Sequence, residues 1–228
     1  MADMNGRVAL LYTDLVLVPF TVELARTELP GLRVMNIVDD AILAGVRGGT
    51  MDQVDLRRRI LEHALRAEEA GADAVLCTCS SVSDAAAAVA PLLRVPLLRI
   101  DDAMVAEAVE NGGDIGVVAT VETAADEVVG KIEALAGERG VVARVRRTVV
   151  PGAFDALSRG DAAAHDEAVL KTVHDELTRS DFVVLAQASM ERVVAALDDA
   201  DRPRVGAPLR PAMRGLMRHQ RTGGGVLV

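Results

Sequence analysis

Short runs of consecutive apolar residues alternate along the chain with longer segments of mixed polarity. Eight of these runs predict buried strands: residues 7–12, 32–38, 73–79, 96–100, 114–119, 141–149, 181–186 and 203–207. The segments between them have the length of helices, and the clearest helical spacing covers residues 52–70, where Gly71 is placed to end the helix. Five apolar side chains of that segment are expected to share its buried face: Val54, Ile60, Leu61, Ala64 and Leu65. Strands that alternate with helices predict an α/β fold with parallel sheets.

Two pairs of segments indicate that the chain repeats itself. GADAVLCTCSSVSDAAAAV aligns with RSDFVVLAQASMERVVAAL at a constant offset of 108 residues, which places Cys79 over Gln187. RVALLYT, which ends at Thr13, aligns with DIGVVAT, which ends at Thr120, at an offset of 107 residues. Because the two matches occur in the same order, they indicate a duplicated α/β unit.

The duplication predicts two lobes related by a pseudo-twofold axis, each a parallel sheet flanked by helices. The expected N-terminal lobe covers residues 1–100 and can also include a C-terminal helix at residues 208–221, while the second lobe covers residues 101–228. Parallel α/β sheets bind their ligands at the carboxyl ends of the strands. We therefore expect the active site in a cleft between the lobes, lined by the strand ends of both.

The composition narrows the class of ligand. Half of the 228 residues are hydrophobic but only 2% are aromatic, which predicts an aliphatic core. A net charge of -9, without a cluster of Lys and Arg, argues against nucleic acid and favours a small-molecule partner. The first apolar run lacks the basic start and the cleavage site of a signal peptide, and charged residues or Gly interrupt every longer apolar stretch. We expect a cytoplasmic protein without a membrane span.

The motifs give no reason to expect a cofactor or a metal. GVRGGTMD at residues 45–52 matches neither the P-loop nor the dinucleotide-binding pattern. The histidines lack zinc-like spacing: His63, His165, His174 and His219. Cys77 and Cys79 are too close along one strand to form an unstrained disulfide, so both thiols are expected to be free.

Cys79 is the strongest candidate for chemistry. It follows a predicted strand and precedes a helix expected to begin near Ser81, so its sulfur is expected at a strand end beside a helix N-terminus. Unpaired backbone N–H groups at such a place favour a thiolate and can also hold a carboxylate. Most free cysteines are small buried hydrophobes, and Cys77 is expected to be one of them. The repeat and the hydroxyls of Ser80 and Ser81 favour a functional role for Cys79.

The chain resembles the aspartate/glutamate/hydantoin racemase superfamily over essentially its whole length, through the strand DAVLCT, a Cys followed by two hydroxyl residues, GVVAT and VVLAQASM. In that superfamily, cofactor-independent enzymes place one cysteine from each lobe on opposite faces of a substrate α-carbon. One thiolate removes a proton and the other thiol returns it. The resemblance implies a small carboxylate-bearing substrate and a homo-oligomer. It also implies the site residues: Cys79 as the first-lobe cysteine, Ser80 and Ser81 as carboxylate binders, Thr120 with its counterpart Thr13 as strand-end hydroxyls, and Ala188 and Ser189 as second-lobe donors.

Gln187 departs from the superfamily pattern, because it stands where the second cysteine is expected. An amide does not exchange a proton at neutral pH, so a symmetric two-thiol racemisation is in question. Three functions stay open. Cys79 can be the acid/base or the nucleophile of an isomerase for an amino acid, a hydantoin or an unsaturated diacid, with Gln187 orienting a carbonyl or carboxylate. It can instead protonate the product of a malonate-like decarboxylation, or belong to a non-catalytic carboxylate-binding pocket. We favour the isomerase.

Four other positions carry weaker expectations. Asp39 and Asp40 follow the second predicted strand, either as cleft residues or as a helix N-cap. His165 is expected to be solvated near the start of a helix, with a general acid as the alternative. Tyr12 is expected either to point into the cleft as an acid/base or to pack as core. The remaining expectations are structural: a solvated helix face for Arg57, Arg58 and Arg59, and a core position for Met190.

Overall fold

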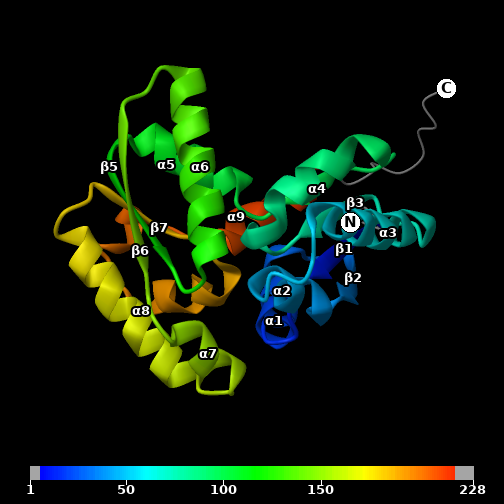
Figure 1. Ribbon diagram of the computed structural model, residues 1–228, viewed down its shortest axis with the longest axis horizontal. Helices are drawn as coiled ribbons and strands as arrows, with labels where there is room; N and C mark the ends of the chain where they lie inside the picture. The colour runs from blue at the N-terminus through cyan, green and yellow to red at the C-terminus, as the bar shows by residue number, and fades with distance from the viewer. Residues whose placement is uncertain (1–5, 219–228) are drawn as a thin grey trace. The chain divides into compact units, whose positions relative to one another are not determined.

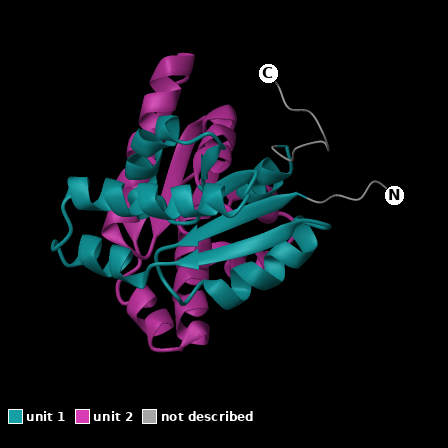
Figure 2. Cartoon of the chain, turned by 90° about the vertical axis from the view of Figure 1, so that its right-hand side faces the viewer, with its two compact units in different colours: residues 1–100, 210–228 teal, residues 101–209 magenta. Residues whose placement is uncertain are grey.

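The computed structural model describes residues 6–218 of the chain. The chain divides into two compact units, coloured separately in Figure 2: unit 1 comprises residues 1–100 and 210–228, and unit 2 comprises residues 101–209. Each unit contains one four-stranded sheet in which neighbouring strands are parallel. All eight predicted strands are present, which confirms the α/β fold with two parallel sheets.

Unit 1 is built on the strand order β2-β1-β3-β4 (Figure 1). Its strands are β1 (Arg7–Tyr12), β2 (Arg33–Val38), β3 (Ala74–Cys77) and β4 (Leu97–Arg99). Its helices are α1 (Val18–Glu28), α2 (Asp40–Arg47), α3 (Gln53–Glu69), α4 (Ser83–Val89) and most of α9 (Leu209–Met217), with the short 3-10 helices η1 (Ser80–Val82) and η2 (Ala90–Leu92). On one face of the sheet, Ala9, Leu11 and Val75 join Leu56 and Ile60 of α3 in an aliphatic cluster. The core of this unit is therefore built from small and branched side chains, as the composition predicts.

Unit 2 repeats this arrangement with the strand order β6-β5-β7-β8. Its strands are β5 (Gly113–Ala119), β6 (Ala143–Val149), β7 (Phe182–Leu185) and β8 (Val205–Gly206). Its helices are α5 (Asp102–Asn111), α6 (Glu122–Arg139), α7 (Ala153–Ser158), α8 (Ala162–Leu177) and the 3-10 helices η3 (Ala188–Ala196) and η4 (Arg202–Arg204). Helices α5 and α6 pack on the face that bears Ile115 and Val117, while α8 and η3 pack on the face that bears Val118 and Leu185. Figure 1 shows α6 and α8 on opposite sides of this sheet.

An aspartate joins two strand starts in the same way in both units, at positions that the repeat places over one another. The Asp73 carboxylate accepts a hydrogen bond from the Arg7 N–H at 2.9 Å, and the Asp73 N–H donates to the Arg7 carbonyl at 2.6 Å. Asp181 makes the same two bonds with Asp114, at 2.9 and 2.7 Å. Gly113 adopts φ +70°, and a Cβ at this position would collide with the Asp181 carboxylate. The close approach of the two strand starts therefore requires glycine here.

Helix α3 follows the predicted helix closely, but its buried face differs from the prediction. Gly71, with φ +84°, ends it as expected. The buried stripe consists of Leu56, Ile60, Ala64 and Ala67. The prediction was wrong for Val54, which is 74% exposed, because this residue lies about 120° around the helix from the stripe. Leu61 and Leu65, on the same flank, are half-buried. Within residues 6–218, no helix is both long enough and apolar enough to cross a membrane.

Helix α9, near the end of the described chain, belongs to unit 1 from Arg210 onward. Arg210 and Arg214 both form ion pairs with Glu28 at the end of α1, with nitrogen–oxygen distances of 2.6 and 3.0 Å. At the start of α9, the N–H of Leu209 donates to the buried carboxylate of Glu191 at 3.0 Å. The predicted helix at 208–221 is thus found over Leu209–Met217, and residues 219–221 lie outside the described part of the chain.

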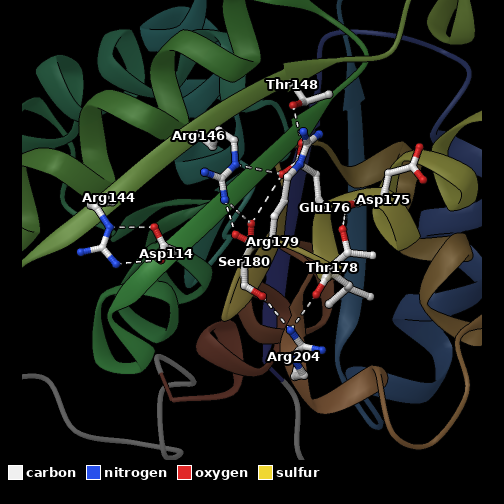
Figure 3. A network of polar contacts seen from close by, with 11 residues as sticks. Asp114, Arg144, Arg146, Thr148, Asp175, Glu176, Thr178, Arg179, Ser180 and Arg204 are labelled. Carbon is white, nitrogen blue, oxygen red and sulfur yellow. Dashed lines mark hydrogen bonds and ion pairs between the residues drawn. The ribbon is translucent and has the colours of Figure 1, made fainter.

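A buried glutamate ties α8 to β6 in unit 2 (Figure 3). The Glu176 carboxylate accepts hydrogen bonds from Thr148 and Arg179, both at 2.7 Å, and pairs with Arg146 at 3.4 Å. Burial by itself raises the pKa of Glu176, but the hydrogen bonds from Thr148 and Arg179 and the charge of Arg179 outweigh burial and hold the pKa below its ordinary value. Gly116 on β5 leaves room for this carboxylate, since a Cβ there would lie 3.0 Å from one of its oxygens.

Candidate active site

Cys79 lies just beyond the carboxyl end of β3, where the sequence places it. Its backbone is extended, with φ -129° and ψ 116°, and it immediately precedes η1. The side chain is half-buried and packs against the aliphatic cluster of unit 1. The α-helix begins later than expected, at Ser83, because the first turn after Cys79 is a 3-10 helix.

A threonine fixes the end of β3 beside β1. Both the N–H and the hydroxyl of Thr78 donate to the carbonyl oxygen of Leu11, each at 3.0 Å. Since β1 and β3 are neighbours in the sheet, Thr13 and Cys79 follow adjacent strand ends. Thr13 is only 3% exposed, and its hydroxyl has no hydrogen-bond partner within residues 6–218. The predicted pair of Thr13 and Cys79 therefore shares one edge of the unit 1 sheet.

Two buried serine hydroxyls next to the predicted catalytic positions lack hydrogen-bond partners in the described part of the chain. They belong to Ser80, which follows Cys79, and to Ser189, which follows Gln187 by two residues, and each residue is 3% exposed. Ser81, the other predicted donor of unit 1, is half-buried. An unsatisfied buried polar atom is rare in folded proteins and calls for an explanation, such as a ligand that accepts its hydrogen bond.

Gln187 occupies an unusual hydrogen-bonding position in unit 2. Its side-chain oxygen accepts from the backbone N–H of Thr120 at 2.6 Å, from the hydroxyl of Thr120 at 3.0 Å and from the backbone N–H of Val121 at 3.1 Å. These groups lie at the carboxyl end of β5, just before α6. The sequence predicted Thr120 as a site residue but not Val121. Every residue except proline has a backbone N–H, so the residue type does not show where such a group will act as a donor.

The strand ends of the two units are built alike. The bond from Thr78 to β1 has a counterpart in unit 2, where the N–H of Ala186 donates to the carbonyl of Val118 at 2.9 Å. Gln187, like Cys79, is an extended residue that immediately precedes a 3-10 helix, with φ -137° and ψ 146°. Ala188, the remaining predicted donor, is the buried first residue of that helix. The backbone thus agrees with the sequence alignment that places Gln187 over Cys79.

Three residues close in sequence to the candidate site positions belong to the core. Cys77 is 1% exposed and lies within the aliphatic cluster of unit 1. Met190 is fully buried, which confirms its predicted core position. Tyr12 is also fully buried, and its hydroxyl donates to the Asn36 side-chain oxygen at 3.0 Å. Burial raises the pKa of Tyr12 above its ordinary value, which makes the phenol a still weaker acid at neutral pH.

Asp39 takes the N-cap position of α2 but uses its side chain elsewhere. Its carboxylate accepts no capping bond and instead lies 3.0 Å from an Arg59 nitrogen and 2.9 Å from Nε2 of His63. Burial opposes ionisation, but the His63 hydrogen bond and the Arg59 charge outweigh it and hold the pKa of Asp39 below its ordinary value. The prediction of a fully solvated arginine run was therefore wrong at Arg59, which anchors α3 to the end of β2.

His165 was wrongly expected to be solvated. It is fully buried, and its Nδ1 lies 2.7 Å from Asp166, which also pairs with Arg192 at 2.7 Å. Its Nε2 is buried without a hydrogen-bond partner among the described residues. Burial lowers the pKa of His165, the Asp166 carboxylate raises it, and the net effect is a pKa below the ordinary value.

Within residues 6–218, no three His, Cys, Asp or Glu side chains are grouped so that they could hold a metal ion. The chemistry of both strand ends is that of a thiol, hydroxyls, an amide and backbone N–H groups. Such groups suit a carboxylate-bearing substrate and proton transfer at a thiol.

The family model for Asp/Glu/hydantoin racemase matches residues 21–209. The chain belongs to the Asp/Glu/hydantoin racemase family. The match covers both units, in agreement with the resemblance inferred from the strand-end motifs. No protein of curated function matches this racemase-family chain.

Solved structures share the fold of this racemase-family chain at low sequence identity. Allantoin racemase from Klebsiella pneumoniae is 18% identical, with 94% of this chain and 87% of that chain covered and a TM-score of 0.67. A glutamate racemase from Bacillus anthracis is 16% identical, with coverage of 93% and 80% and a TM-score of 0.69. An arylmalonate decarboxylase is 14% identical, with coverage of 96% and 94% and a TM-score of 0.63. The same fold therefore occurs in racemases and in a decarboxylase.

Proposed function

We propose that the chain is a cofactor-independent isomerase of the racemase type that acts at the α-carbon of a small carboxylate substrate, with Cys79 as its working thiol. One observation carries the proposal: a half-buried thiol at a strand end is followed in the sequence by Ser80, whose buried hydroxyl has no partner in the described chain. A substrate carboxylate would satisfy that hydroxyl. Membership of the racemase family supports the reaction class.

The chemistry requires one proton acceptor and a way to stabilise negative charge. The Cys79 thiolate would take the α-proton, and the electron pair of the broken C–H bond would move into the substrate carboxyl group to form an enediolate. Hydroxyl and N–H donors such as Ser80 and Ser81 would stabilise the enediolate oxygens. Delivery of a proton from water to the opposite face of the α-carbon would then give the isomer, and the Cys79 thiol would release its proton to water. Return of the thiol proton to the same face would instead regenerate the substrate. An amino acid or a hydantoin with a hydrogen on its α-carbon fits this chemistry. An unsaturated diacid would instead require reversible addition of the Cys79 thiolate to its double bond, rotation about the resulting single bond and loss of the thiolate.

A malonate-like decarboxylase is the second candidate. It is favoured by the presence of a single thiol at the described strand ends, because Cys77 is core and Gln187 takes the position equivalent to Cys79 in unit 2. In this reaction the bond between the α-carbon and one carboxylate would break, carbon dioxide would leave, and the electron pair would form the same enediolate. The Cys79 thiol would then protonate the α-carbon and regain its proton from water. One thiol suffices for that sequence.

The test is solvent-deuterium incorporation into aspartate, glutamate, hydantoin, maleate and substituted malonates, each incubated with the wild-type protein and with Cys79→Ser. We expect deuterium at the α-carbon of at least one substrate with the wild type and none with Cys79→Ser. Cys77→Ala is the matched control, since it removes the neighbouring core thiol and should leave incorporation in place. Deuterium incorporation without release of carbon dioxide from the substrate would indicate the isomerase. Deuterium incorporation with release of carbon dioxide would indicate the decarboxylase.

The alternative of a non-catalytic carboxylate-binding protein gives a different result. In that case one of these carboxylates would bind the wild type, as measured by calorimetry, and no deuterium would enter it with either protein. Equal incorporation by the wild type and Cys79→Ser would also overturn the proposal, because it would exclude Cys79 as the acid/base.

A further inference from the structure

The three donors that surround the Gln187 oxygen determine which way its amide group faces. Two of them are the backbone N–H groups of Thr120 and Val121, which can only donate. The amide nitrogen carries hydrogens and cannot accept these bonds, so the amide cannot exchange its oxygen and nitrogen positions without losing them. The oxygen is therefore held at the end of β5, and Nε2 points away from Thr120 and Val121.

The amide nitrogen of Gln187 is the group left to contact a ligand. Its two hydrogens have no acceptor within residues 6–218, although the side chain is half-buried. Two residues later, the buried hydroxyl of Ser189 also lacks a partner in the described chain. The start of η3 thus presents two unsatisfied donors close together in sequence. A ligand that satisfies both must bring acceptor oxygens.

We propose that Gln187 is a fixed hydrogen-bond donor to a carboxylate or carbonyl oxygen of the substrate. The proposal rests on the proposed function, because the ligand it names is the substrate of that enzyme. It narrows the substrate class to small acids with a second oxygen acceptor, such as dicarboxylates.

A competing arrangement would use the same donors differently. A substrate carboxylate could displace the Gln187 oxygen and bind the N–H groups of Thr120 and Val121 itself. Titration of the Cys79→Ser variant with malonate distinguishes these two arrangements. The binding is monitored through the backbone and side-chain amide signals in 15N-resolved NMR spectra. We expect malonate to shift the Gln187 side-chain amide signals while the Thr120 and Val121 signals move little. Large shifts of Thr120 and Val121, or an unchanged Gln187 side-chain signal with bound malonate, would overturn the proposal.

Substitution of Gln187 tests the roles of the oxygen and the nitrogen of its side-chain amide separately. Gln187→Glu keeps an acceptor oxygen for Thr120 and Val121 but removes both donor hydrogens, and we expect malonate affinity to fall at least about tenfold. Unchanged Thr120 and Val121 amide signals would show that the strand end is intact. Gln53→Glu is the matched control, because it makes the same chemical change at an exposed residue and should leave the affinity unchanged. Equal malonate affinity in Gln187→Glu and the wild type would contradict the donor role.

The donor role and the proposed function can fail separately. Malonate binding that depends on Gln187, without deuterium incorporation into any substrate, would reject the proposed function and leave the donor role intact. Deuterium incorporation that depends on Cys79, with equal malonate affinity in Gln187→Glu and the wild type, would reject the donor role and leave the proposed function standing.

Discussion

The side-chain oxygen of Gln187 lies 2.6 Å from the backbone nitrogen of Thr120, and this contact joins the end of β7 to the end of β5. With the further bonds from the Thr120 hydroxyl and the Val121 N–H, the amide oxygen has three donors. The side chain is therefore a structural connection as well as a candidate ligand for the substrate.

Removal of this connection should lower the stability of unit 2. We expect Gln187→Ala to reduce the free energy of unfolding by about 1–2 kcal/mol, because several donors lose a half-buried acceptor. Urea unfolding followed by circular dichroism measures the change. Gln187→Glu, which retains an acceptor oxygen, should lose less. Equal losses in the two variants would show that the side-chain oxygen is not what holds the strand ends together.

The two cysteines should differ in accessibility. Cys79 is half-buried at a strand end, whereas Cys77 is 1% exposed within the core. We expect iodoacetamide to modify Cys79 first in the native protein, as measured by mass spectrometry of peptides after brief exposure. In urea both thiols should react at similar rates, which controls for the reagent. Earlier native modification of Cys77 would contradict the described burial.

Gly113 should tolerate no side chain. Gly113→Ala places a Cβ against the Asp181 carboxylate at φ +70°, and we expect a loss of more than about 2 kcal/mol in unfolding free energy. Gly130→Ala, inside α6, is the control because a Cβ there meets no atom within 4 Å. It should stabilise the protein by up to about 1 kcal/mol. Thermal unfolding of both variants measures the contrast, and similar melting temperatures would contradict it.

Glu176 should contribute to acid sensitivity. Its folded pKa lies below the ordinary value of 4.5, so the stabilising effect of its carboxylate is complete above that pH and is lost as the pH falls through the folded pKa. We expect Glu176→Gln to be about 2–3 kcal/mol less stable at pH 7 and to lose less stability than the wild type on acidification. Urea unfolding from pH 7 to pH 3 measures both effects. Parallel pH profiles would exclude Glu176 as a source of the acid sensitivity.

His165 should produce a second pH dependence at milder acidity. The pKa of His165 in the folded protein lies below the ordinary value of 6.5. As the pH falls, this imidazole is therefore protonated in the unfolded chain before it is protonated in the folded protein. Stability should therefore fall as the pH is lowered through 6.5. His165→Gln should flatten the profile between pH 7.5 and 5.5, measured as unfolding free energy in urea. His174→Gln, at an exposed position, is the control and should leave the slope unchanged.

The repeated pattern of apolar runs was enough to predict the strands and the parallel sheets, because buried strands leave a strong local signal. The identity of Cys79 as a strand-end residue followed from the same pattern. The burial of His165 and the anchoring of Arg59 by Asp39 could not be predicted, since they depend on which side chains meet from distant segments. The orientation of the Gln187 amide was equally hidden, because backbone N–H groups at the end of β5 determine it.

The ion pairs of Arg210 and Arg214 with Glu28 have a consequence for how the chain folds during synthesis. Unit 2 is continuous over residues 101–209, so it can fold as soon as that segment has left the ribosome. Unit 1 begins first but is completed last, because α9 must be translated before Glu28 gains its two arginine partners. The order of synthesis and the order of completion are therefore reversed, and a nascent chain stalled before residue 210 would carry a finished second unit and an unfinished first one.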